Sequence, residues 1–426
     1  MMNGNRTDLP VAVIGAGPVG LAAAAHLLEW GREPLILEAS SQVGQHVREW
    51  AHVRMFSPWK LNVDEAARRL LRRHGWEEPH AEHHPSGGDL VRAYLEPLAR
   101  TPEIRERLRL GASVTSVARR DMDRLKDAGR DASPFLLRAG ADHELQVEAA
   151  AVVDTSGTWR TPNPLGANGL AVRGEADAHD RIHYRIPDVS GERRSRFLGR
   201  RTLVVGSGHS AFNVLHDLAA LQREDPRTRV DWLVRATEPH QIFEGGENDP
   251  LSEREELKRR VHGLVESGHF RLIPGGRIDG VDSSDRGLVA WNHGHPLEPV
   301  DEIVACTGFR PDFRGSSEIR LALDAVTESP WKLATHIDPN IHDCGSVPAH
   351  GVDELAHPEP GFYLAGIKSY GRAPNFLLTT GYEAVRSIAA ELGGDPVAAR
   401  RIQRNLPGGV HPCAGPEAQR APTCCA

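Results

Sequence analysis

The feature that most constrains this chain is a glycine-rich turn that directly follows a short apolar run near the N-terminus. Val11-Ala12-Val13-Ile14 is continuously apolar, as expected of a parallel strand buried on both faces. Gly15-Ala16-Gly17-Pro18-Val19-Gly20 follows and matches the pattern GxGxxG, and Leu21 to Trp30 then predicts a helix ended by Gly31. A strand, turn and helix in this order predict a binding site for a pyrophosphate.

Each glycine of this turn has a mechanical role in such a site. Gly15 permits the tight turn, Gly17 lets the backbone approach a phosphate, and Gly20 allows the helix and strand to pack closely. The next predicted strand, Leu35-Ile36-Leu37, ends in Glu38, whose carboxylate can accept hydrogen bonds from ribose hydroxyls. The complete context favours a dinucleotide site over the alternative, a glycine-rich turn beside a surface glutamate.

A second unit of the same kind begins near the middle of the chain. Gly206-Ser207-Gly208-His209-Ser210-Ala211 reads as GxGxxA and follows the predicted strand Thr202 to Val205. The next strand, Val230 to Val234, is followed by Arg235 rather than an acid, which favours the 2′-phosphate of NADPH over NADH. A surface arginine in an arginine-rich chain is the alternative, and no chemistry is assigned to His209.

The rest of the chain supplies further elements. We expect a helix over Ser86 to Ala99, with Asp89 in its first turn, and a charged helix over Leu251 to Ser267. Three strands, expected at Ser113 to Val117, Phe135 to Arg138 and Leu145 to Val153, predict an antiparallel meander on the edge of the first domain.

Composition excludes several classes of function. The net charge is −7 and there is no long basic run, so no nucleic-acid partner is expected. The apolar stretch Val11 to Leu28 is interrupted by glycines, Pro18 and His26, which argues against a secretory signal or a membrane span. No other apolar run is long enough to span a bilayer, so no membrane partner is expected. The five cysteines form no spaced framework, which favours a cytoplasmic protein.

Three segments resemble landmarks of the two-domain FAD/NAD(P) flavoproteins. Asp154-Thr155-Ser156-Gly157 resembles the segment that leads toward the NADP domain, and residues 301–311, DEIVACTGFRP, closely resemble the segment that leads back. Gly361-Phe362-Tyr363-Leu364-Ala365-Gly366 is the third. The resemblance implies an α/β fold with two Rossmann-like three-layer dinucleotide-binding domains, in which the NAD(P) domain is inserted in the FAD domain. It implies FAD and NADPH as cofactors.

The implied domain boundaries follow these landmarks. The FAD-binding domain is expected over 1–160 and 301–396, and the NAD(P)H-binding insert over 161–300. A Pro-, Arg- and Ala-rich tail over 397–426 is expected to be disordered. A homodimer is compatible with this organisation.

Within this superfamily the chain is most similar to class B flavin-dependent monooxygenases and to the flavin monooxygenases of bacterial arsenic-resistance clusters. Residues 369–377, SYGRAPNFL, resemble the latter. This implies hydroperoxyflavin oxygenation of a small molecule with O₂. The fingerprint FxGxxxHxxx(F/W/Y) is matched incompletely, because His179 falls one residue late after Val172-Arg173-Gly174. Oxygenation is therefore less firmly implied than the cofactors.

The motifs and the resemblance together predict the residues of the sites. Those expected at FAD are Gly15, Gly17, Pro18, Gly20, Glu38, Val114, Gly157, Gly366, Arg372, Pro374 and Asn375. Those expected at NADP are Gly206, Gly208, Ser210, Ala211 and Arg235.

Other residues are expected to act on the flavin directly. In the loop after the first ribose-binding strand, Ser57 and Asn62 could hydrogen-bond flavin or nicotinamide and Trp59 could cover the ring; an ordinary folded loop is the equal alternative. Pro374 is expected to begin the last long helix. The resemblance implies that the N-terminus of this helix faces the flavin's pyrimidine edge, where its dipole would stabilise negative charge. Lys368 or Arg372 could add to that positive field, or be surface cations.

Two groups of residues raise the question of metals. His80, His83 and His84 are interpreted as solvated loop histidines, so no metal site is expected there. Cys424 and Cys425 could capture a soft metal or metalloid, which leaves a disulfide-type or metalloid reductase as the alternative function. No CxxC or CxxxxC motif accompanies them, which counts against it. A non-enzymatic nucleotide sensor is a third reading, but both cofactor motifs are intact.

Overall fold

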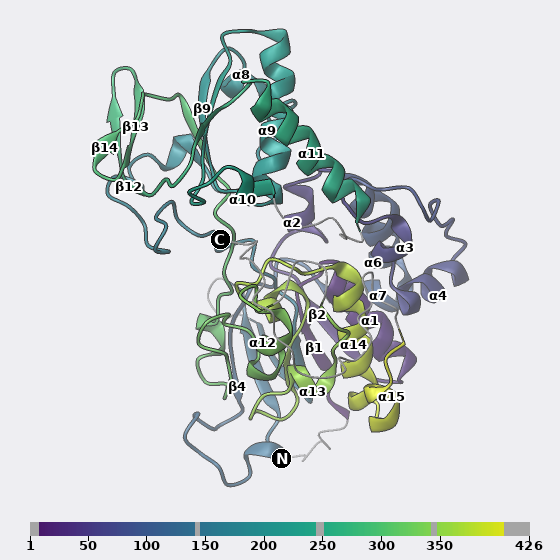
Figure 1. Ribbon diagram of the computed structural model, residues 1–426. Helices are drawn as coiled ribbons and strands as arrows, with labels where there is room; N and C mark the ends of the chain where they lie inside the picture. The colour runs from purple at the N-terminus through teal and green to yellow at the C-terminus, as the bar shows by residue number, and fades with distance from the viewer. Residues whose placement is uncertain (1–7, 141–144, 244–250, 342–346, 404–426) are drawn as a thin grey trace, which may run out of the picture. The chain divides into compact units, whose positions relative to one another are not determined.

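The computed structural model describes residues 8–140, 145–243, 251–341 and 347–403. The described chain forms two compact units (Figure 1). Unit 1 comprises the residues up to Arg160 and from Arg310 onward, and unit 2 is the continuous segment Thr161–Phe309. This arrangement, with one unit inserted in the other, is the α/β fold class that the resemblance to the two-domain flavoproteins implied.

The core of unit 1 is a sheet of five parallel strands in the order β16-β7-β1-β2-β3. Its strands are β1 (Val11–Ile14), β2 (Pro34–Leu37), β3 (Leu108–Arg109), β7 (Ala151–Asp154) and β16 (Phe362–Leu364). The first four-residue apolar run is fully buried, because both faces of the sheet are covered.

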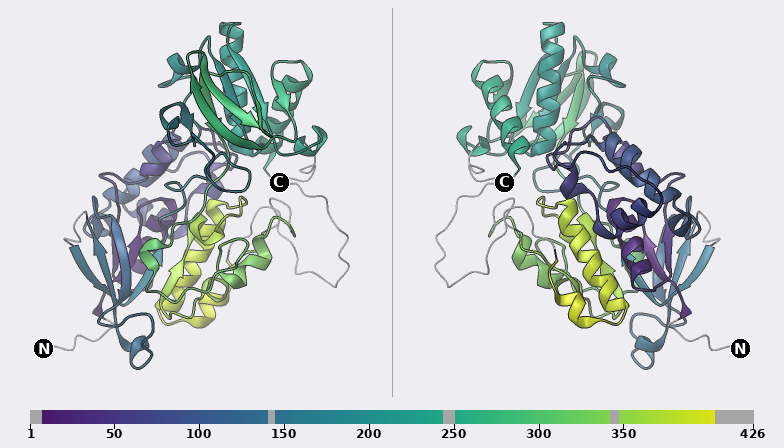
Figure 2. Two further views of the ribbon diagram at one scale, coloured as in Figure 1. Left: turned by 90° about the vertical axis from the view of Figure 1, so that its left-hand side faces the viewer. Right: turned by 90° about the vertical axis from the view of Figure 1, so that its right-hand side faces the viewer.

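Helices cover one face of this sheet. The longest are α1 (Pro18–Glu29) and α14 (Leu378–Leu392), which lie side by side although they come from opposite ends of the chain (Figure 2). The others in unit 1 are α2 (Gln45–Arg48), α3 (Trp59–Asn62), α4 (Glu65–Arg73), α5 (Gly87–Leu90), η2 (Val91–Leu95), α6 (Glu96–Arg100), α7 (Pro102–Arg105), η3 (Arg130–Ala132), η5 (Arg314–Ser316), α12 (Trp331–Ile337), α13 (Val352–Leu355), η6 (Gly366–Tyr370) and α15 (Pro396–Arg400). The helix expected over Ser86 to Ala99 is confirmed as the continuous run α5–η2–α6, capped by Ser86 and Asp89.

An antiparallel meander covers the other face. It consists of β4 (Val114–Arg119), β5 (Phe135–Ala139) and β6 (Leu145–Ala149), and Phe135 and Leu137 pack on the sheet. The meander is a sheet of its own rather than an edge of the parallel sheet. The prediction of one strand over Leu145 to Val153 was wrong in its length, because two strands cover this range. At Ala150 the backbone N–H donates to Pro10 O, and the chain leaves the meander and enters the parallel sheet as β7.

Unit 2 repeats the layers of unit 1. Its parallel sheet has the order β11-β10-β9-β15-β8, α9 and α11 pack together, and β12, β13 and β14 form a separate antiparallel sheet that shares a core with the parallel one. The elements are β8 (Ile182–His183), β9 (Arg201–Val205), α9 (His209–Glu224), β10 (Arg229–Leu233), α10 (His240–Phe243), α11 (Ser252–Glu266), β11 (Arg271–Ile273), β12 (Ile278–Ser284), β13 (Gly287–Asn292), β14 (His295–Pro296) and β15 (Glu302–Ala305), with η4 (His179–Arg181) and α8 (Arg194–Phe197).

The return to unit 1 comes later than residue 301. β15 pairs in parallel with β9, so residues 301–309 belong to unit 2, and the expected boundary after residue 300 was early. The apolar sequence of β15 predicts a buried strand, but it does not indicate whether this strand joins the sheet of unit 1 or that of unit 2.

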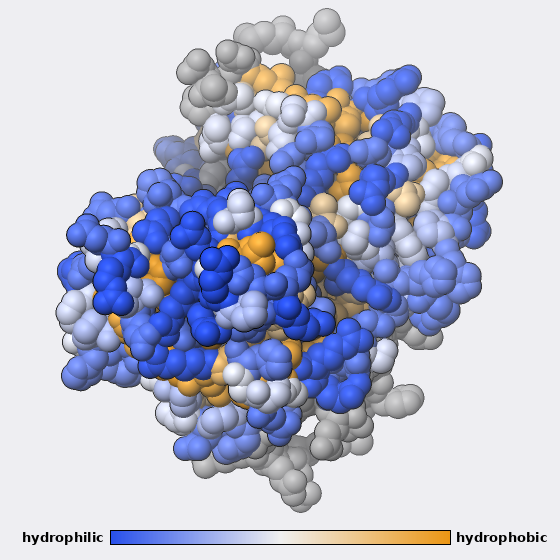
Figure 3. Space-filling model, turned by 90° about the horizontal axis from the view of Figure 1, so that it is seen from above, coloured by the Kyte–Doolittle hydropathy of each residue, from blue (hydrophilic) through white to orange (hydrophobic). Residues whose placement is uncertain are grey.

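The start of the tail expected to be disordered is helical. α15 packs on α14, and the Arg386 guanidinium donates to Ala398 O at 2.9 Å and Arg401 O at 2.7 Å. The prediction was therefore wrong for residues 397–403, and residues 404–426 lie outside the described part. None of the described helices is long and apolar enough to cross a membrane. Hydrophilic residues cover most of the face seen in Figure 3, with small apolar patches between them.

Candidate cofactor-binding sites

The first glycine-rich turn links β1 to α1 in a conformation that larger residues would disturb. Gly15 has φ +100°, and a Cβ on Gly20 would lie 2.0 Å from Gly15 O. The strand and helix can therefore cross this closely only with glycine at position 20. Thr155, at the end of β7, donates from Oγ1 to Ile14 O at 2.8 Å and fixes the adjacent strand end.

In contrast, Gly17 borders open space. A Cβ built there meets no atom within 4 Å, and its φ of −80° suits any residue. Gly17 is the N-cap of α1, and no described side chain caps this helix end. The N–H groups of the first turn and the helix dipole are thus available to an anion, which fits a pyrophosphate.

Glu38 is held next to this turn by two backbone groups. Its Oε2 accepts from Ala16 N at 2.7 Å and its Oε1 from Ser40 N at 2.9 Å. Each carboxylate oxygen keeps a further lone pair for another donor. The carboxylate is therefore fixed at the end of β2 and could accept the ribose hydroxyls of a dinucleotide.

A buried ion pair joins β7 to η6 in the same unit. Lys368 Nζ lies 2.6 Å from Asp154 Oδ2 and donates to Ser156 Oγ at 3.0 Å. Both charged side chains are buried. Lys368 is thus neither a surface cation nor an uncompensated charge, because Asp154 balances it. Sequence reasoning missed this pair; the only local signal was an aspartate at the end of an apolar strand.

The segment after η6 differs from the expectation. α14 begins at Leu378, so the prediction that Pro374 is its first residue was wrong. Phe376 explains the delay, because its ring packs against Tyr370 and Gly381, which holds residues 374–377 outside the helix. Arg372 forms an ion pair with Glu328 at 2.8 Å.

Asn375 is buried in this segment with an unused acceptor. Its side chain is 8% exposed and Nδ2 donates weakly to Ile337 O at 3.4 Å, whereas Oδ1 has no partner among the described residues. A buried amide oxygen without a donor is costly. This orphaned acceptor fits a ligand that carries a hydrogen-bond donor, as the flavin ring does.

Four other expected FAD residues lie at the margins of these elements. Gly157 (φ +76°) follows β7, and Gly366 (φ +69°) begins η6 with Val19 of α1 next to it. Pro18 is the first residue of α1, and Val114 is the half-buried first residue of β4. Pro18 therefore belongs to the first turn, and Gly366 lies near this turn because it is next to Val19.

Ser57 and Asn62 lie close together, but in this structure they hydrogen-bond to each other. Ser57 Oγ donates to Asn62 Oδ1 and Asn62 Nδ2 donates to Ser57 O, both at 2.7 Å. Asn62 is fully buried, and Trp59 packs in the main core of unit 1. In this conformation all three residues stabilise the loop around α3.

The second turn repeats the first one in unit 2. Gly206 has φ +116°, and a Cβ there would lie 2.3 Å from Cys306 O; Gly208 is the N-cap of α9 and borders open space. Ser210 and Ala211 lie in the first turn of α9, where Ala211 is buried. The second turn therefore also has one glycine that the protein's own packing requires, Gly206, and one that borders open space, Gly208.

Arg235 follows β10 and is exposed, with its carbonyl accepting from Arg277 Nη1 at 3.0 Å. His209 begins α9 and packs edge-on against Phe212. Burial, together with the charges of Arg254 and Lys258, lowers the pKa of His209 to about 3.

The incomplete monooxygenase fingerprint lies at the start of unit 2. Gly174 has φ +74°, and a Cβ there would lie 1.9 Å from Val281 O, so this glycine allows the chain to cross β12. His179 Nδ1 lies 3.0 Å from Ala176 O. Both contacts are within unit 2 and explain the local turn.

The described residues contain no candidate metal site of three or more ligands and no cysteine pair. No group of three or more His, Cys, Asp or Glu side chains there is arranged to hold a metal ion. Cys306 is the free cysteine of this part, and burial raises the pKa of its thiol to about 12. Cys424 and Cys425 lie outside the described residues.

Comparison with known proteins agrees with this geometry. The family model for pyridine nucleotide-disulphide oxidoreductases matches residues 12–328. A flavin-containing monooxygenase of Arabidopsis thaliana is 23% identical over 72% of this chain, which spans only 61% of that protein's length. A ferredoxin–NADP reductase of Salinispora tropica is 27% identical, covering 80% of this chain and 86% of the reductase.

Solved structures share the fold at low sequence identity. A bacillithiol disulfide reductase from Bacillus cereus superposes with a TM-score of 0.66 at 19% identity, covering 90% of this chain and 98% of that chain. The cadaverine monooxygenase of desferrioxamine biosynthesis from Erwinia amylovora gives 0.65 at 13% identity, covering 96% and 99%. The fold is therefore common to reductases and oxygenases.

Proposed function

Since the chain belongs to the pyridine nucleotide-disulphide oxidoreductase family, we propose that it is an FAD-dependent NADPH oxidoreductase that oxygenates a small molecule with O₂. The observation that carries the proposal is the pair of glycine-rich turns, each with an open glycine at a helix N-terminus. Glu38 beside one and Arg235 beside the other give the two sites different preferences. A cytoplasmic location and a homodimer remain predictions.

The first turn would hold FAD and the second NADPH. Gly17 and α1 would take the FAD pyrophosphate, Glu38 the ribose, and Asn375 Oδ1 a donor of the ring. Gly208 and α9 would take the NADPH pyrophosphate, and Arg235 the 2′-phosphate. Bound FAD would supply the two-electron chemistry, accepting a hydride from NADPH and delivering electrons to O₂.

The names and lengths of the relatives support two versions of this chemistry. Several relatives of this chain are named flavin-containing monooxygenases, which supports oxygenation. The Salinispora reductases match over more of their own length, at 86%, which supports a second candidate, a plain NADPH-dependent reductase of an electron acceptor. A reductase that uses Cys424 and Cys425 is less favoured, because Cys306, the described cysteine, has a buried thiol of raised pKa.

Anaerobic reduction followed by mixing with oxygen separates the candidates. The purified flavoprotein is reduced with NADPH, mixed with O₂, and its flavin spectrum is followed by stopped flow. For an oxygenase we expect a spectrum distinct from both the oxidised and reduced flavin that outlives mixing. Slow return to the oxidised spectrum without such a species, with rapid NADPH turnover only when ferricyanide is added, favours the reductase. A colourless protein that does not take up FAD contradicts both.

The choice of nicotinamide cofactor is tested at Arg235. We expect Arg235→Gln to lower kcat/KM for NADPH about tenfold or more while leaving that for NADH unchanged, because only NADPH carries the 2′-phosphate. Arg229→Gln is the control: this exposed arginine begins β10, at the opposite end of the same strand. Equal losses for both cofactors in Arg235→Gln would contradict the assignment.

A further inference from the structure

Two long helices of unit 2, α9 and α11, begin at the same edge of the parallel sheet. α9 connects β9 to β10, and α11 lies between β10 and β11 along the chain. Because β9, β10 and β11 are parallel neighbours, both helices run back along the sheet in the same direction from its carboxyl edge. The two helices pack side by side (Figure 1). The first turns of α11 are therefore at the same edge as Gly208, the N-cap of α9.

One face of α11 carries two cations next to its buried residues. Leu257 and Val261 are the buried residues of this helix. Arg254 lies three residues before Leu257, and Lys258 lies four residues after Arg254, so both cations lie along the stripe that the buried residues define. Both are half-buried. The face of α11 that packs in unit 2 therefore carries positive charge over its first two turns.

His209, the first residue of α9, senses these two charges. Its ring packs edge-on against Phe212, and burial together with Arg254 and Lys258 lowers the pKa of the imidazole to about 3. A positive charge disfavours the imidazolium form, and its effect weakens with distance. The position of the two cations on α11 and their effect on His209 therefore agree: both act at the N-terminus of α9.

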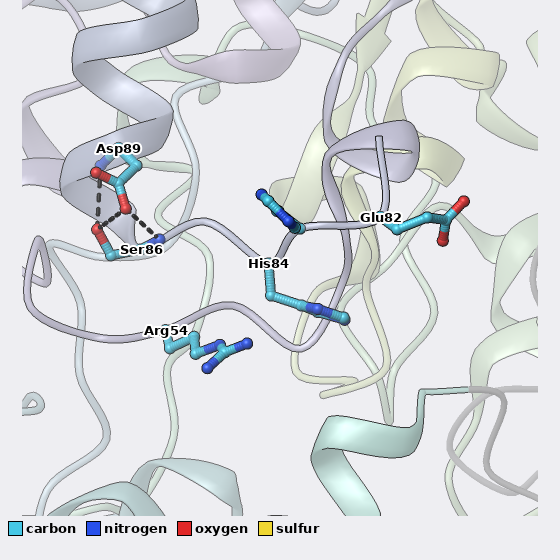
Figure 4. A pocket seen from close by; sticks show the side chains of 6 residues that line it. Arg54, Glu82, His84, Ser86 and Asp89 are labelled. Atoms are coloured by element: carbon cyan, nitrogen blue, oxygen red, sulfur yellow. Dashed lines mark hydrogen bonds between the residues drawn. The ribbon is translucent and has the colours of Figure 1, made fainter. Parts of the chain in front are cut away.

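A pocket in unit 1 has charges of both signs instead. It is lined by Arg54, Glu82, His83, His84, Ser86 and Asp89 (Figure 4). Glu82 pairs with Lys60 at 2.8 Å, and Asp89 accepts from Ser86 Oγ at 2.8 Å within the capping box of α5. These two carboxylates would oppose an anion in the pocket, whereas both charges that act on His209 are positive.

We propose that Arg254 and Lys258 are positioning residues for the pyrophosphate of NADPH or NADH at the second turn. The inference rests on the proposed function, since it requires that this turn binds a nicotinamide dinucleotide. The N-terminus of α9 offers backbone N–H groups, and the two cations add positive charge that balances the phosphates. NADPH and NADH share the pyrophosphate, so the two cations strengthen the binding of both, in contrast to Arg235.

This role does not require the two cations to be free of other interactions. Both have interactions within the protein. A fixed charge acts on an anion over several ångströms and needs no unused hydrogen-bond donor. Glu253 and Glu255 also lie in the first turn of α11, yet the two charges that act on His209 are positive. The field at the N-terminus of α9 therefore favours an anion.

Calorimetric titration of the full-length flavoprotein with NADP⁺ and with NAD⁺ tests the inference. We expect Arg254→Gln and Lys258→Gln each to raise the Kd of both dinucleotides about threefold to tenfold. Arg235→Gln should raise the Kd of NADP⁺ alone. The losses in Arg254→Gln and Lys258→Gln should shrink at about 0.5 M NaCl, because salt screens the charges. The charge-retaining variants Arg254→Lys and Lys258→Arg should keep most of the affinity, which a role in packing alone does not predict.

Arg259→Gln and Arg260→Gln are the matched controls. Both arginines belong to the same helix, are exposed and pair with Glu256, so each variant should change the two Kd values less than about twofold.

Three results would overturn the inference. They are equal losses in Arg254→Gln and Arg259→Gln, losses that salt does not change, and equal losses in Arg254→Gln and Arg254→Lys. If the parent protein binds neither dinucleotide, the proposed function is contradicted and this inference with it. If the parent binds NADP⁺ and both glutamine variants bind it equally well, only this inference is contradicted.

Discussion

At the scale of single residues, glycines of the two turns serve opposite purposes. Gly20 and Gly206 sit where a Cβ would lie 2.0 Å and 2.3 Å from a carbonyl oxygen, so they shape the protein itself. Gly17 and Gly208 border space that contains no protein atom within 4 Å. Their backbone angles suit any residue, so the protein alone does not require glycine there. A ligand approaching the backbone would.

The first prediction separates these purposes with alanine. We expect the free energy of unfolding of Gly17→Ala to lie within about 1 kcal/mol of that of the parent protein. Its affinity for FAD should fall more than about tenfold, because the new methyl group occupies the approach to the helix N-terminus. Urea unfolding of the FAD-free proteins and fluorescence titration with FAD measure the two effects.

The matching variants are Gly208→Ala and Gly20→Ala. Gly208→Ala should retain FAD and raise the KM for NADPH, whereas Gly20→Ala should destabilise unit 1 because its methyl group meets Gly15 O. Full FAD affinity in Gly17→Ala would show that the first turn does not hold the pyrophosphate.

At the scale of elements, two buried ionic clusters hold distant segments of unit 1 together. Glu359, before β16, pairs with Arg119 of β4 at 2.7 Å and with Arg130 of η3 at 2.6 Å. Arg119 also covers the Phe135 ring at 3.8 Å. Asp154 and Lys368 form the second cluster, between β7 and η6. Each cluster joins the meander or the last third of the chain to the parallel sheet.

The second prediction concerns Glu359. Burial raises the pKa of this carboxyl, but hydrogen bonds from Arg130 and Arg119 outweigh burial, and the pKa is lowered overall. Its contribution to stability is therefore fully present above the unfolded pKa of about 4.3 and is lost as the pH falls through the folded value.

The measurement is urea unfolding of Glu359→Gln across this pH range. We expect a loss of about 3 kcal/mol near neutral pH, because two arginines remain buried without their carboxylate, and a smaller loss in acid. Glu148→Gln, which breaks a surface pair with Arg120, is the control and should cost less than about 1 kcal/mol. A pH-independent loss in Glu359→Gln would contradict the assigned ion triad.

The third prediction concerns the pair of Asp154 and Lys368. We expect Lys368→Gln to reduce stability by about 3 kcal/mol, because it leaves a buried carboxylate uncompensated. The double variant Asp154→Asn with Lys368→Gln should recover part of this loss, and thermal unfolding of the four proteins yields the coupling energy. Additive losses would mean that the two charges do not interact.

At the scale of the whole molecule, the two units differ in continuity. Unit 2 is one uninterrupted segment with a core of its own, whereas unit 1 is assembled from both ends of the chain. The two connections hydrogen-bond to each other, since Asn163 N donates to Gly308 O at 2.9 Å and Asn163 Nδ2 to Thr307 O at 3.0 Å. The ends of unit 2 are therefore adjacent.

The fourth prediction follows from this continuity. A chain of residues 161–309 alone should fold, because all five strands of its parallel sheet and both packed helices are within it. We expect a cooperative thermal transition by circular dichroism and NADP⁺ binding by calorimetry without FAD. The same segment with Gly208→Ala should fold and bind NADP⁺ more weakly. A non-cooperative transition would show that unit 2 depends on unit 1.

The sequence by itself determined the features that depend on neighbouring residues. Both strand–turn–helix units and the helix after Ser86 could be predicted from local residue patterns, whereas the insertion of one unit in the other was implied by the resemblance to a known family. The reason is physical: a tight turn, a helix cap and a buried strand impose their residue types within a few positions. Glu38 and Arg235 could be singled out for the same reason.

Only the tertiary structure decided which groups meet over long distances. Lys368 and Asp154 are 214 positions apart, so no local pattern reveals that one compensates the other. The mutual bonds of Ser57 and Asn62, the sheet that takes β15, and the delayed start of α14 also depend on packing partners elsewhere in the chain. The glycine-rich turns could be predicted from the sequence because their residues are neighbours along the chain. Burial and charge balance, in contrast, are properties of the assembled fold.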